Sequence, residues 1–386
     1  MSNRIVTLFC LLSLLISCGK PASGQTDITP ETEPEVPGGQ DMSAFLATNQ
    51  YIETFLEEVN YPNTNKYDTD KEYGYSLVKR YPGGGPSENN CELPPTYTIE
   101  WTATAADGAL KLQVWEGSWS REYNLPAGTT SQGITNLVPC RTYGYKVTGT
   151  GDALVAEGSF KTRGMLHQIY FEPNVRNGRD LGGWKGLNGK TVAYRKLFRG
   201  GVLQGGAKYF NNAGKAEMRA QGIKAELDLQ EEGVAQSSSP LGSDIAFFAP
   251  HFASGWNEMV ARNTDKVKEC FCWIVDRLRE DKPVYFHCWA GRDRTGTLAV
   301  LLLGTLGVSE SDMAKDFELT YFSPKSWSMY EDAYQHTRDN CSYKSIRKTI
   351  YEKTVSGTYQ DRIVKYLIQI GVPEKDIQDF REIMLE

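Results

Sequence analysis

Residues 284–296 read VYFHCWAGRDRTG, and their order determines how the second half of the chain is expected to fold. Residues 284–287 are an apolar run typical of a buried strand, and the apolar residues 297–306 predict a helix. The loop between them places Cys288 at a helix N-terminus, where backbone N–H groups and the helix dipole attract anions. The same field favours a thiolate, so we predict that Cys288 is a nucleophile beside a bound phosphate.

The residues after Cys288 suit that chemistry. Gly291 would let the loop turn where a side chain would clash. The planar guanidinium of Arg294 can hold two phosphate oxygens and stabilise their charge in the transition state. Thr295 can donate its hydroxyl hydrogen to the thiolate. We expect phosphate to be bound by Trp289, Ala290, Gly291, Arg292, Asp293, Arg294 and Thr295.

A second Cys-x5-Arg sequence in the chain serves as a control. It runs from Cys341 to Arg347, but Asn340 precedes it, Lys344 stands where the loop glycine should be, and no apolar strand leads into it. We interpret this copy as accidental. Cys288 has all the flanking features, so we prefer a functional to a packing role for it.

HCWAGRDRTG resembles the signature of cysteine-dependent protein tyrosine phosphatases, and is similar above all to a bacterial tyrosine/lipid-type group with HCxxGKDRTG. NGRDLGG at residues 177–183 fits the NxRDLGG opening of that family, and RKLFRGGVL at residues 195–203 fits RxLYRSGxL. The chain departs from the pattern with Gly200 for Ser, Gln230 for Arg and Arg292 for Lys. The resemblance implies an α/β phosphatase domain over residues 164–386, with a central sheet flanked by helices and a Cys-x5-Arg loop, here called the P-loop.

The family mechanism, carried to this chain, has Cys288 attack phosphorus and Arg294 hold the phosphoryl group. Water then hydrolyses the cysteinyl-phosphate, and neither a metal nor another cofactor is needed. The expected substrate is phosphotyrosine in a phosphorylated protein, and the extra loop arginine motivates a phosphoinositide or inositol phosphate as an alternative. An alternative of another class is a surface binding lipoprotein with an inactive phosphatase-like domain, but the Cys, Gly and Arg of the loop are intact.

The leaving oxygen needs a proton, so a general acid is expected. Our candidates are, in order, Asp228 at a predicted strand end, Asp293 in the P-loop, and Asp244 in the Ser-rich sequence SSSPLGSD, which could act as a mobile lid. Asp228 belongs to Leu227-Asp228-Leu229, which resembles the DLR strand end of the family.

Five further residues receive supporting roles. We expect His287 to orient the loop by hydrogen bonding rather than act as a base. Arg199 and Arg292 would add positive potential at the mouth of the site, and Arg292 would either contact a second phosphate or be solvated. Trp289 would wall the pocket or pack beneath the loop. We expect Asp180, in a Gly-rich turn, to cap backbone N–H groups.

The N-terminal region predicts export. Residues 1–17 combine a positive charge with a short apolar run, and Leu-Ile-Ser-Cys18 resembles the bacterial lipobox, in which the cysteine is lipidated. A plain signal peptide is the alternative. Residues 18–40 are poor in large apolar residues and predict a flexible tether. We expect attachment to a bacterial membrane through lipid, facing the periplasm or the exterior.

Between the tether and the phosphatase-like region we expect two parts. Residues 41–84 predict a helical or irregular segment with one amphipathic helix. Residues 85–163 alternate in polarity and predict an all-β sandwich, which resembles a fibronectin type III module and could take a protein or glycan partner. An oxidising compartment would permit a disulfide between Cys91 and Cys140.

Composition excludes other classes. The 42 Lys and Arg residues against 48 Asp and Glu residues give a net charge of −6, which is unsuited to a general nucleic-acid binder. The four histidines are never paired at ligand spacing, which leaves little from which to build a catalytic metal centre. Cys270 and Cys272 lie on a predicted helix over residues 264–280 and are assigned to packing.

Overall fold

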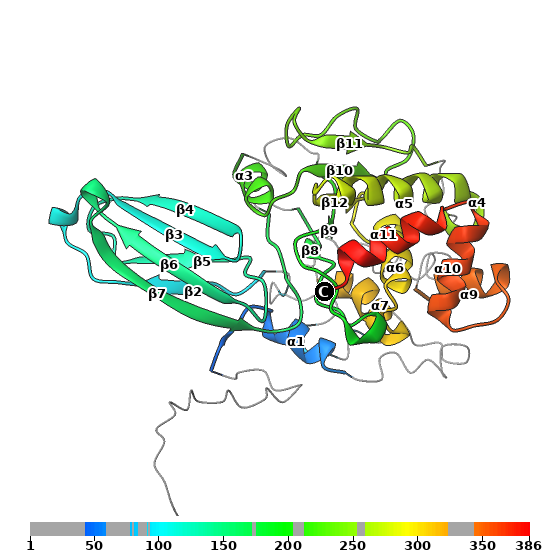
Figure 1. The fold of residues 1–386 in the computed structure, drawn as a ribbon, viewed down its shortest axis with the longest axis horizontal. Coiled ribbons are helices and arrows are strands. Elements are labelled where there is room, and N and C mark those ends of the chain that lie inside the picture. Colours follow the sequence, from blue (N-terminus) through cyan, green and yellow to red (C-terminus); the bar gives the residue numbers. More distant parts are fainter. Residues whose placement is uncertain are drawn as a thin grey trace, which may run out of the picture. The chain divides into compact units, whose positions relative to one another are not determined.

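The computed structural model describes residues 43–58, 78, 81–83, 91, 93–171, 175–203, 212–252, 259–322 and 343–386 (Figure 1). Residues 1–39 and 40–386 form two separate units, and every described residue belongs to the second. The predicted signal and tether, Cys18 and Cys341 lie outside the described residues.

One five-stranded sheet, in the order β11-β10-β12-β9-β8, organises the second half of the chain. Its strands are β8 (Arg179–Asp180), β9 (Leu197–Gly200), β10 (Ala225–Asp228), β11 (Ala246–Phe248) and β12 (Val284–His287). The strands β9 to β12 pair in parallel, and β8 is antiparallel to β9. All residues of β9, β10 and β12 are buried, as expected for parallel strands covered on both faces. The loops that follow these strands therefore meet at one edge.

Helices surround this sheet and, with it, form what we call the α/β domain (Figure 1). They are α3 (Asn212–Ala220), α4 (Met259–Arg262), α5 (Thr264–Arg279), α6 (Asp293–Thr305), α7 (Glu310–Glu318), α9 (Tyr343–Lys353), α10 (Tyr359–Gln369) and α11 (Glu374–Met384). The predicted helix over 264–280 is confirmed as α5, which buries Cys270 in the core and packs Cys272 against it. Among the described residues, no helix has the length and hydropathy to span a bilayer.

Two further sheets are formed by residues 97–163 together with the short strand β1 from earlier in the chain. The first pairs β2 (Tyr97–Glu100) with β5 (Ser131–Ile134), and the second has the order β1-β7-β6-β3-β4. The strands of the second are β1 (Phe45–Leu46), β3 (Leu110–Glu116), β4 (Trp119–Leu125), β6 (Thr142–Thr148) and β7 (Leu154–Arg163). Ile99 and Ile134 of one sheet share a buried cluster with Leu112 and Val147 of the other. We call this region the sandwich.

The helix that follows β1 belongs to the α/β domain. The helix α1 (Gln50–Leu56) is shorter than the predicted segment, and its Phe55 ring lies 5.1 Å from the ring of Phe322. Lys315 of α7 donates from Nζ to the carbonyl of Leu56 at 2.7 Å and so caps the helix. The sandwich strands β2 to β7 therefore form an insertion within the α/β domain, and β1 joins them from before α1.

The disulfide that an oxidising compartment would permit between Cys91 and Cys140 is not formed in this structure, where both residues are free cysteines. Cys91 is buried in the core of the α/β domain, in the same cluster as Ile52. Cys140 is exposed in the turn before β6, and its thiol lies 3.5 Å from the carbonyl of Gly164. The two side chains take part in different parts of the fold and so do not meet.

Candidate active site

The P-loop lies where the sequence predicts it, between β12 and α6. Cys288 is 3% exposed, directly after the last residue of β12. Gly291 has a φ of +67°, a region that side chains other than glycine rarely adopt. A Cβ atom on Gly291 would lie 2.3 Å from the carbonyl carbon of Gly200, so the close approach of two backbones also requires glycine.

The surroundings of Cys288 favour its thiolate. Burial raises the pKa of the thiol, and the charge of Asp293 does the same, but the guanidinium of Arg294 lowers it. The hydroxyl and the backbone N–H of Thr295 lower it further, and the net direction is below the ordinary value. Thr295 is fully buried at the start of α6, and donation of its hydroxyl to the thiolate stays a prediction.

Arg294 is held by two contacts from the loop after β10. Its Nη1 donates to the carbonyl of Leu229 at 2.5 Å, and its Nη2 forms an ion pair with Glu231. These contacts fix the plane of the guanidinium before phosphate arrives. Sequence reasoning missed Glu231, because nothing in the run LDLQEE distinguishes one glutamate from the next.

His287 orients the loop, as predicted. It is fully buried, with Nε2 3.1 Å from Oε1 of Glu226 and Nδ1 3.3 Å from the carbonyl oxygen of Cys288. Burial lowers the pKa of His287, but the contact with Glu226 and the charge of Asp228 raise it more, to about 9. The imidazole is therefore protonated at neutral pH and can donate to both oxygens.

The outer side of the P-loop is clamped at one carbonyl. The oxygen of Gly291 accepts hydrogen bonds from Nδ2 of Asn177 and Nη2 of Arg199, each at 2.9 Å. Asp316 of α7 holds the clamp by pairing with Arg199 and, at 3.0 Å, with Nε of Arg179. A carbonyl fixed outward leaves neighbouring N–H groups free to point toward the phosphate position.

The predicted place of Arg199 at the mouth of the site is wrong, because this side chain is completely buried. Burial lowers its pKa to about 9, with help from Arg179 and against the charge of Asp316. No sequence signal pointed to Asp316, which lies 117 positions from Arg199.

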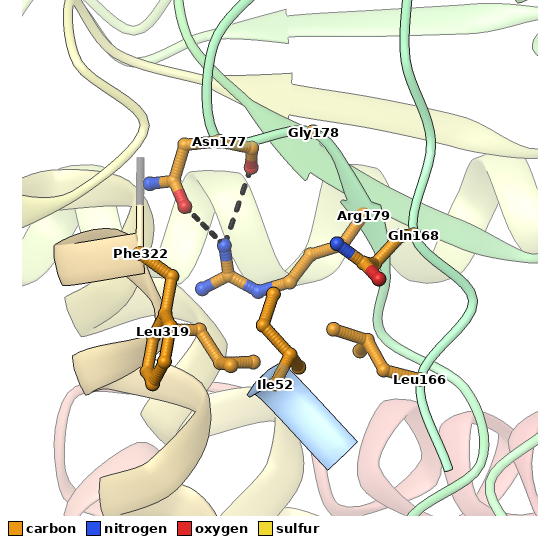
Figure 2. A pocket seen from close by; sticks show the side chains of 8 residues that line it. All are labelled: Ile52, Leu166, Gln168, Asn177, Gly178, Arg179, Leu319 and Phe322. Carbon is orange, nitrogen blue, oxygen red and sulfur yellow. Dashed lines mark hydrogen bonds between the residues drawn. The ribbon is translucent and has the colours of Figure 1, made fainter. Parts of the chain in front are cut away.

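A small cavity of about 20 Å³ lies beside the clamp (Figure 2). It is lined by Ile52, Leu166, Gln168, Asn177, Gly178, Arg179, Leu319 and Phe322. Figure 2 shows the Arg179 guanidinium reaching the side chain and the carbonyl of Asn177. Such a volume has room for about one water molecule, so it is too small for a substrate.

Asp180 has the capping role that the sequence predicts. Its Oδ1 accepts from the N–H of Gly182 at 2.8 Å, and its Oδ2 accepts from the N–H of Arg195 at 2.6 Å. Oδ2 also lies 3.0 Å from Nδ1 of His167. The carboxylate thus fixes the Gly-rich turn that follows Asn177 and Arg179.

Two of the three candidate acids are wrong. Asp228 is fully buried, and its two oxygens accept from the N–H groups of Gln230 and Gln236, at 3.0 and 2.9 Å. Its role is therefore to hold the loop after β10. Asp244 precedes β11, so it lies at the sheet edge opposite the P-loop, where its exposed side chain pairs with Arg219 at 2.7 Å.

Asp293 remains, at the first position of α6. Its Oδ1 accepts from Nε and Nη2 of Arg292, both at 2.6 Å. Arg292 is only 7% exposed, so the solvated alternative for this residue is wrong. The charge of Arg292 also acts on the buried Glu318: burial raises the pKa of this carboxyl to about 8, while Arg292 lowers it.

Trp289 is 48% exposed, which excludes packing beneath the loop. Its carbonyl accepts from the N–H of Val202 at 3.1 Å, so the backbone is fixed while the indole reaches solvent. That the ring walls the pocket stays a prediction. Within the described ranges, no three His, Cys, Asp or Glu side chains are gathered so that they could hold a metal ion.

Known proteins similar to this chain point to one family. The model of the tyrosine phosphatase family matches residues 172–386, more than half of the chain. A candidate tyrosine-protein phosphatase of Cupriavidus necator is 25% identical over 174 residues, covering 39% of this chain and 62% of its own length. A tyrosine-protein phosphatase of Nostoc commune is 25% identical over 131 residues, covering 28% of this chain and 44% of its own length. The chain thus spans less than two thirds of these relatives.

Solved structures with similarity include TpbA of P. aeruginosa, at 15% identity and a TM-score of 0.27. The match covers 40% of this chain and 88% of TpbA. Tk-PTP in its active form has 17% identity and a TM-score of 0.25, with 45% of this chain and 92% of Tk-PTP covered. On the extent of the family match, which includes the P-loop and its clamp, the chain belongs to the tyrosine phosphatase family.

Proposed function

We propose that this protein is a phosphatase that hydrolyses phosphotyrosine in proteins through a cysteinyl-phosphate. The observation that carries the proposal is the buried thiol of Cys288 at the start of α6, with a lowered pKa and Arg294 beside it. The names of the two curated relatives support phosphotyrosine as the substrate. The Cys, Gly and Arg of the P-loop are all present, which favours an enzyme over a binding protein with an inactive domain.

The reaction proceeds in two displacements. The Cys288 thiolate forms a bond to phosphorus while the bond to the ester oxygen breaks, and the tyrosine leaves as a phenol after accepting one proton. Water then attacks the cysteinyl-phosphate and gives one proton back to the acid that lost it in the first step, while the bond between sulfur and phosphorus breaks to release inorganic phosphate and restore the thiolate. Arg294 holds two nonbridging oxygens throughout, because Leu229 and Glu231 fix its guanidinium.

Asp293 is the proposed general acid, since it is the one candidate that lies in the P-loop. Its Oδ1 is held by the guanidinium of Arg292, so delivery of a proton to the leaving oxygen requires that this contact open when substrate binds.

The decisive experiment measures hydrolysis of para-nitrophenyl phosphate by the whole protein without added metal. We expect activity in the wild type, none in Cys288→Ser, and full activity in the matched control Cys272→Ser on α5. A wild type no faster than Cys288→Ser would refute the phosphatase. A panel of phosphotyrosine peptides and inositol phosphates then decides the substrate, and faster release from the inositol phosphates would overturn our choice.

Two further proposals rest on the sequence. We propose that Cys18 is lipidated and holds the protein at a bacterial membrane, and that residues 85–163 are a fibronectin type III-like module. The pairing of β2 with β5 and the order β4-β3-β6-β7 support the module. Labelled palmitate should enter the wild type but not Cys18→Ser, and equal labelling of the two would contradict the lipid anchor.

A further inference from the structure

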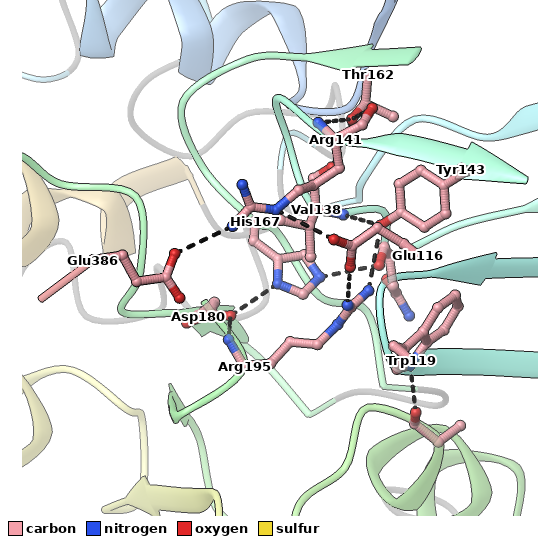
Figure 3. A network of polar contacts seen from close by, with 12 residues as sticks. Glu116, Trp119, Val138, Arg141, Tyr143, Thr162, His167, Asp180, Arg195 and Glu386 are labelled. Atoms are coloured by element: carbon pink, nitrogen blue, oxygen red, sulfur yellow. Dashed lines mark hydrogen bonds and ion pairs between the residues drawn. The ribbon is translucent and has the colours of Figure 1, made fainter. Parts of the chain in front are cut away.

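The sandwich contacts the α/β domain through the hairpin of β3 and β4 (Figure 3). Oε2 of Glu116 pairs with Nη1 of Arg195 at 2.5 Å. The same guanidinium lies 4.5 Å from the ring centre of Trp119, whose Nε1 donates to the carbonyl of Ala220 at 2.8 Å. The side chains of Glu116 and Arg195 are 17% and 16% exposed, so salt screens this pair less than a surface pair.

The backbone of Arg195 is held in an unusual conformation. Its φ is +59°, the left-handed region that residues with a Cβ atom rarely adopt. Two groups keep it there: the sandwich holds the side chain, and Oδ2 of Asp180 accepts from the backbone N–H at 2.6 Å. A residue in this region requires support from its surroundings.

A second contact from the sandwich reaches the same carboxylate. Nε2 of His167 lies 3.0 Å from the carbonyl oxygen of Asn136, which follows β5, and Nδ1 lies 3.0 Å from Oδ2 of Asp180. Asp180 and His167 are both fully buried. Asp180 therefore accepts from two groups that the sandwich positions (Figure 3).

From Asp180 the contacts continue to the P-loop. Arg179 is its neighbour in β8 and donates to Oδ1 of Asn177. Asn177 in turn donates to the carbonyl of Gly291 at 2.9 Å. Each link is a buried hydrogen bond or the peptide chain itself, so a displacement of the turn would be transmitted to the loop.

We infer that the sandwich positions the phosphate-binding loop, with Glu116 and Arg195 as positioning residues for catalysis. The sandwich thereby supports the reaction from behind the P-loop, in addition to any partner that it binds. This inference deepens the proposed phosphatase function and rests on it for its kinetic consequence, but the geometry of Cys288 can be tested without any turnover.

The first test is a double-mutant cycle with Glu116→Gln, Arg195→Gln and their combination. We expect each single variant to lower kcat roughly tenfold with KM unchanged, and the loss in the double variant to be smaller than the product of the two single losses, since both variants remove the pair between Glu116 and Arg195. The matched control is Lys196→Gln. It removes the neighbouring ion pair with Asp281, at 2.9 Å, which does not involve the sandwich, and it should leave kcat unchanged.

The deciding readout is the rate of alkylation of Cys288 by iodoacetamide against pH, followed by peptide mass spectrometry. A displaced loop loses N–H groups from the thiolate, so the profile of Glu116→Gln should shift to higher pH, while that of Lys196→Gln should match the wild type. An unshifted profile in both Glu116→Gln and Arg195→Gln overturns the inference, whatever their stability. A shifted profile in a protein that hydrolyses no phosphate ester supports it and refutes the proposed function instead.

Discussion

The charge of Cys288 depends on a few side chains that come from distant parts of the chain. Arg294 follows it closely in sequence, but the groups that fix Arg294 and the loop carbonyl come from after β10, from β9 and from α7. The short-range features of the site, which are Cys288, Gly291 and Arg294 in the P-loop and the capping by Asp180 in its own turn, were predictable because spacing within one loop or one turn determines each of them. The buried positions of Asp228 and Arg199 were not predictable, because they depend on contacts with other segments. Asp228 accepts from the backbone N–H of Gln236, and Arg199 pairs with Asp316.

The acid assignment is tested by the dependence of rate on the leaving group. Asp293→Asn should slow the release of phenol, a poor leaving group, by roughly a hundredfold, and hardly affect that of dinitrophenol, which needs no proton. Asp228→Asn is the comparison: it loses a backbone acceptor and should lower the melting temperature, with equal effects on both esters. A leaving-group effect seen only in Asp228→Asn would reverse our assignment.

The buried imidazolium of His287 makes a pH-dependent contribution to stability. Its pKa is about 9 in the folded protein against an ordinary value of 6.5, so the contribution is complete below pH 6.5 and disappears as the pH rises through 9. Urea unfolding of the wild type should therefore show a decreasing free energy over this range. Glu226→Gln removes the group that raises the pKa and should flatten the curve, and a curve as steep as the wild type's would argue against the pair.

At the scale of elements, the sheet explains which predictions succeeded. The apolar period of α5 and the apolar run of β12 are local patterns, and both elements lie where they were predicted. The Ser-rich loop failed as a lid, because the parallel order of β10 and β11 places Asp244 at the edge opposite the P-loop. The order of strands in a sheet depends on contacts between separate segments, so the sequence of β10 or of β11 alone does not predict it.

The helix α1 offers a direct test of the core. Phe55 is fully buried against Phe322, so Phe55→Ala should lower the free energy of unfolding of the α/β domain by about 3–5 kcal/mol. Val355→Ala, at a residue that is 81% exposed, should change it by less than about 0.5 kcal/mol. Urea titrations monitored by tryptophan fluorescence give both values. Equal midpoints for the two variants would mean that α1 is not part of the core.

At the scale of the whole molecule, the sandwich separates α1 from the rest of the domain that α1 completes. The resemblance predicted an α/β region over residues 164–386, but its core also contains residues from before the sandwich, such as Ile52 and Cys91. The spacing of apolar residues predicts the helix α1 but not the core against which it packs. Contacts between segments more than a hundred positions apart leave no local pattern in the sequence.

A fragment of residues 164–386 should therefore fail to fold cooperatively, whereas residues 43–386 should unfold in a sharp transition. The fragment lacks Phe55 and exposes the apolar surface that α1 covers. Differential scanning calorimetry distinguishes the two, with the longer chain as the control. A sharp transition in the short fragment would show that the insertion does not divide the core.

The glycine that replaces serine at position 200 has a consequence for how relatives of this chain can vary. A Cβ atom there would lie 2.5 Å from the hydroxyl of Tyr285, which donates to the carbonyl of Gly201 at 2.5 Å. The tyrosine oxygen thus occupies the space of the family's serine side chain. Gly200→Ser should be tolerated only together with Tyr285→Phe, so the two positions are expected to covary: serine with a residue that lacks the hydroxyl, glycine with tyrosine.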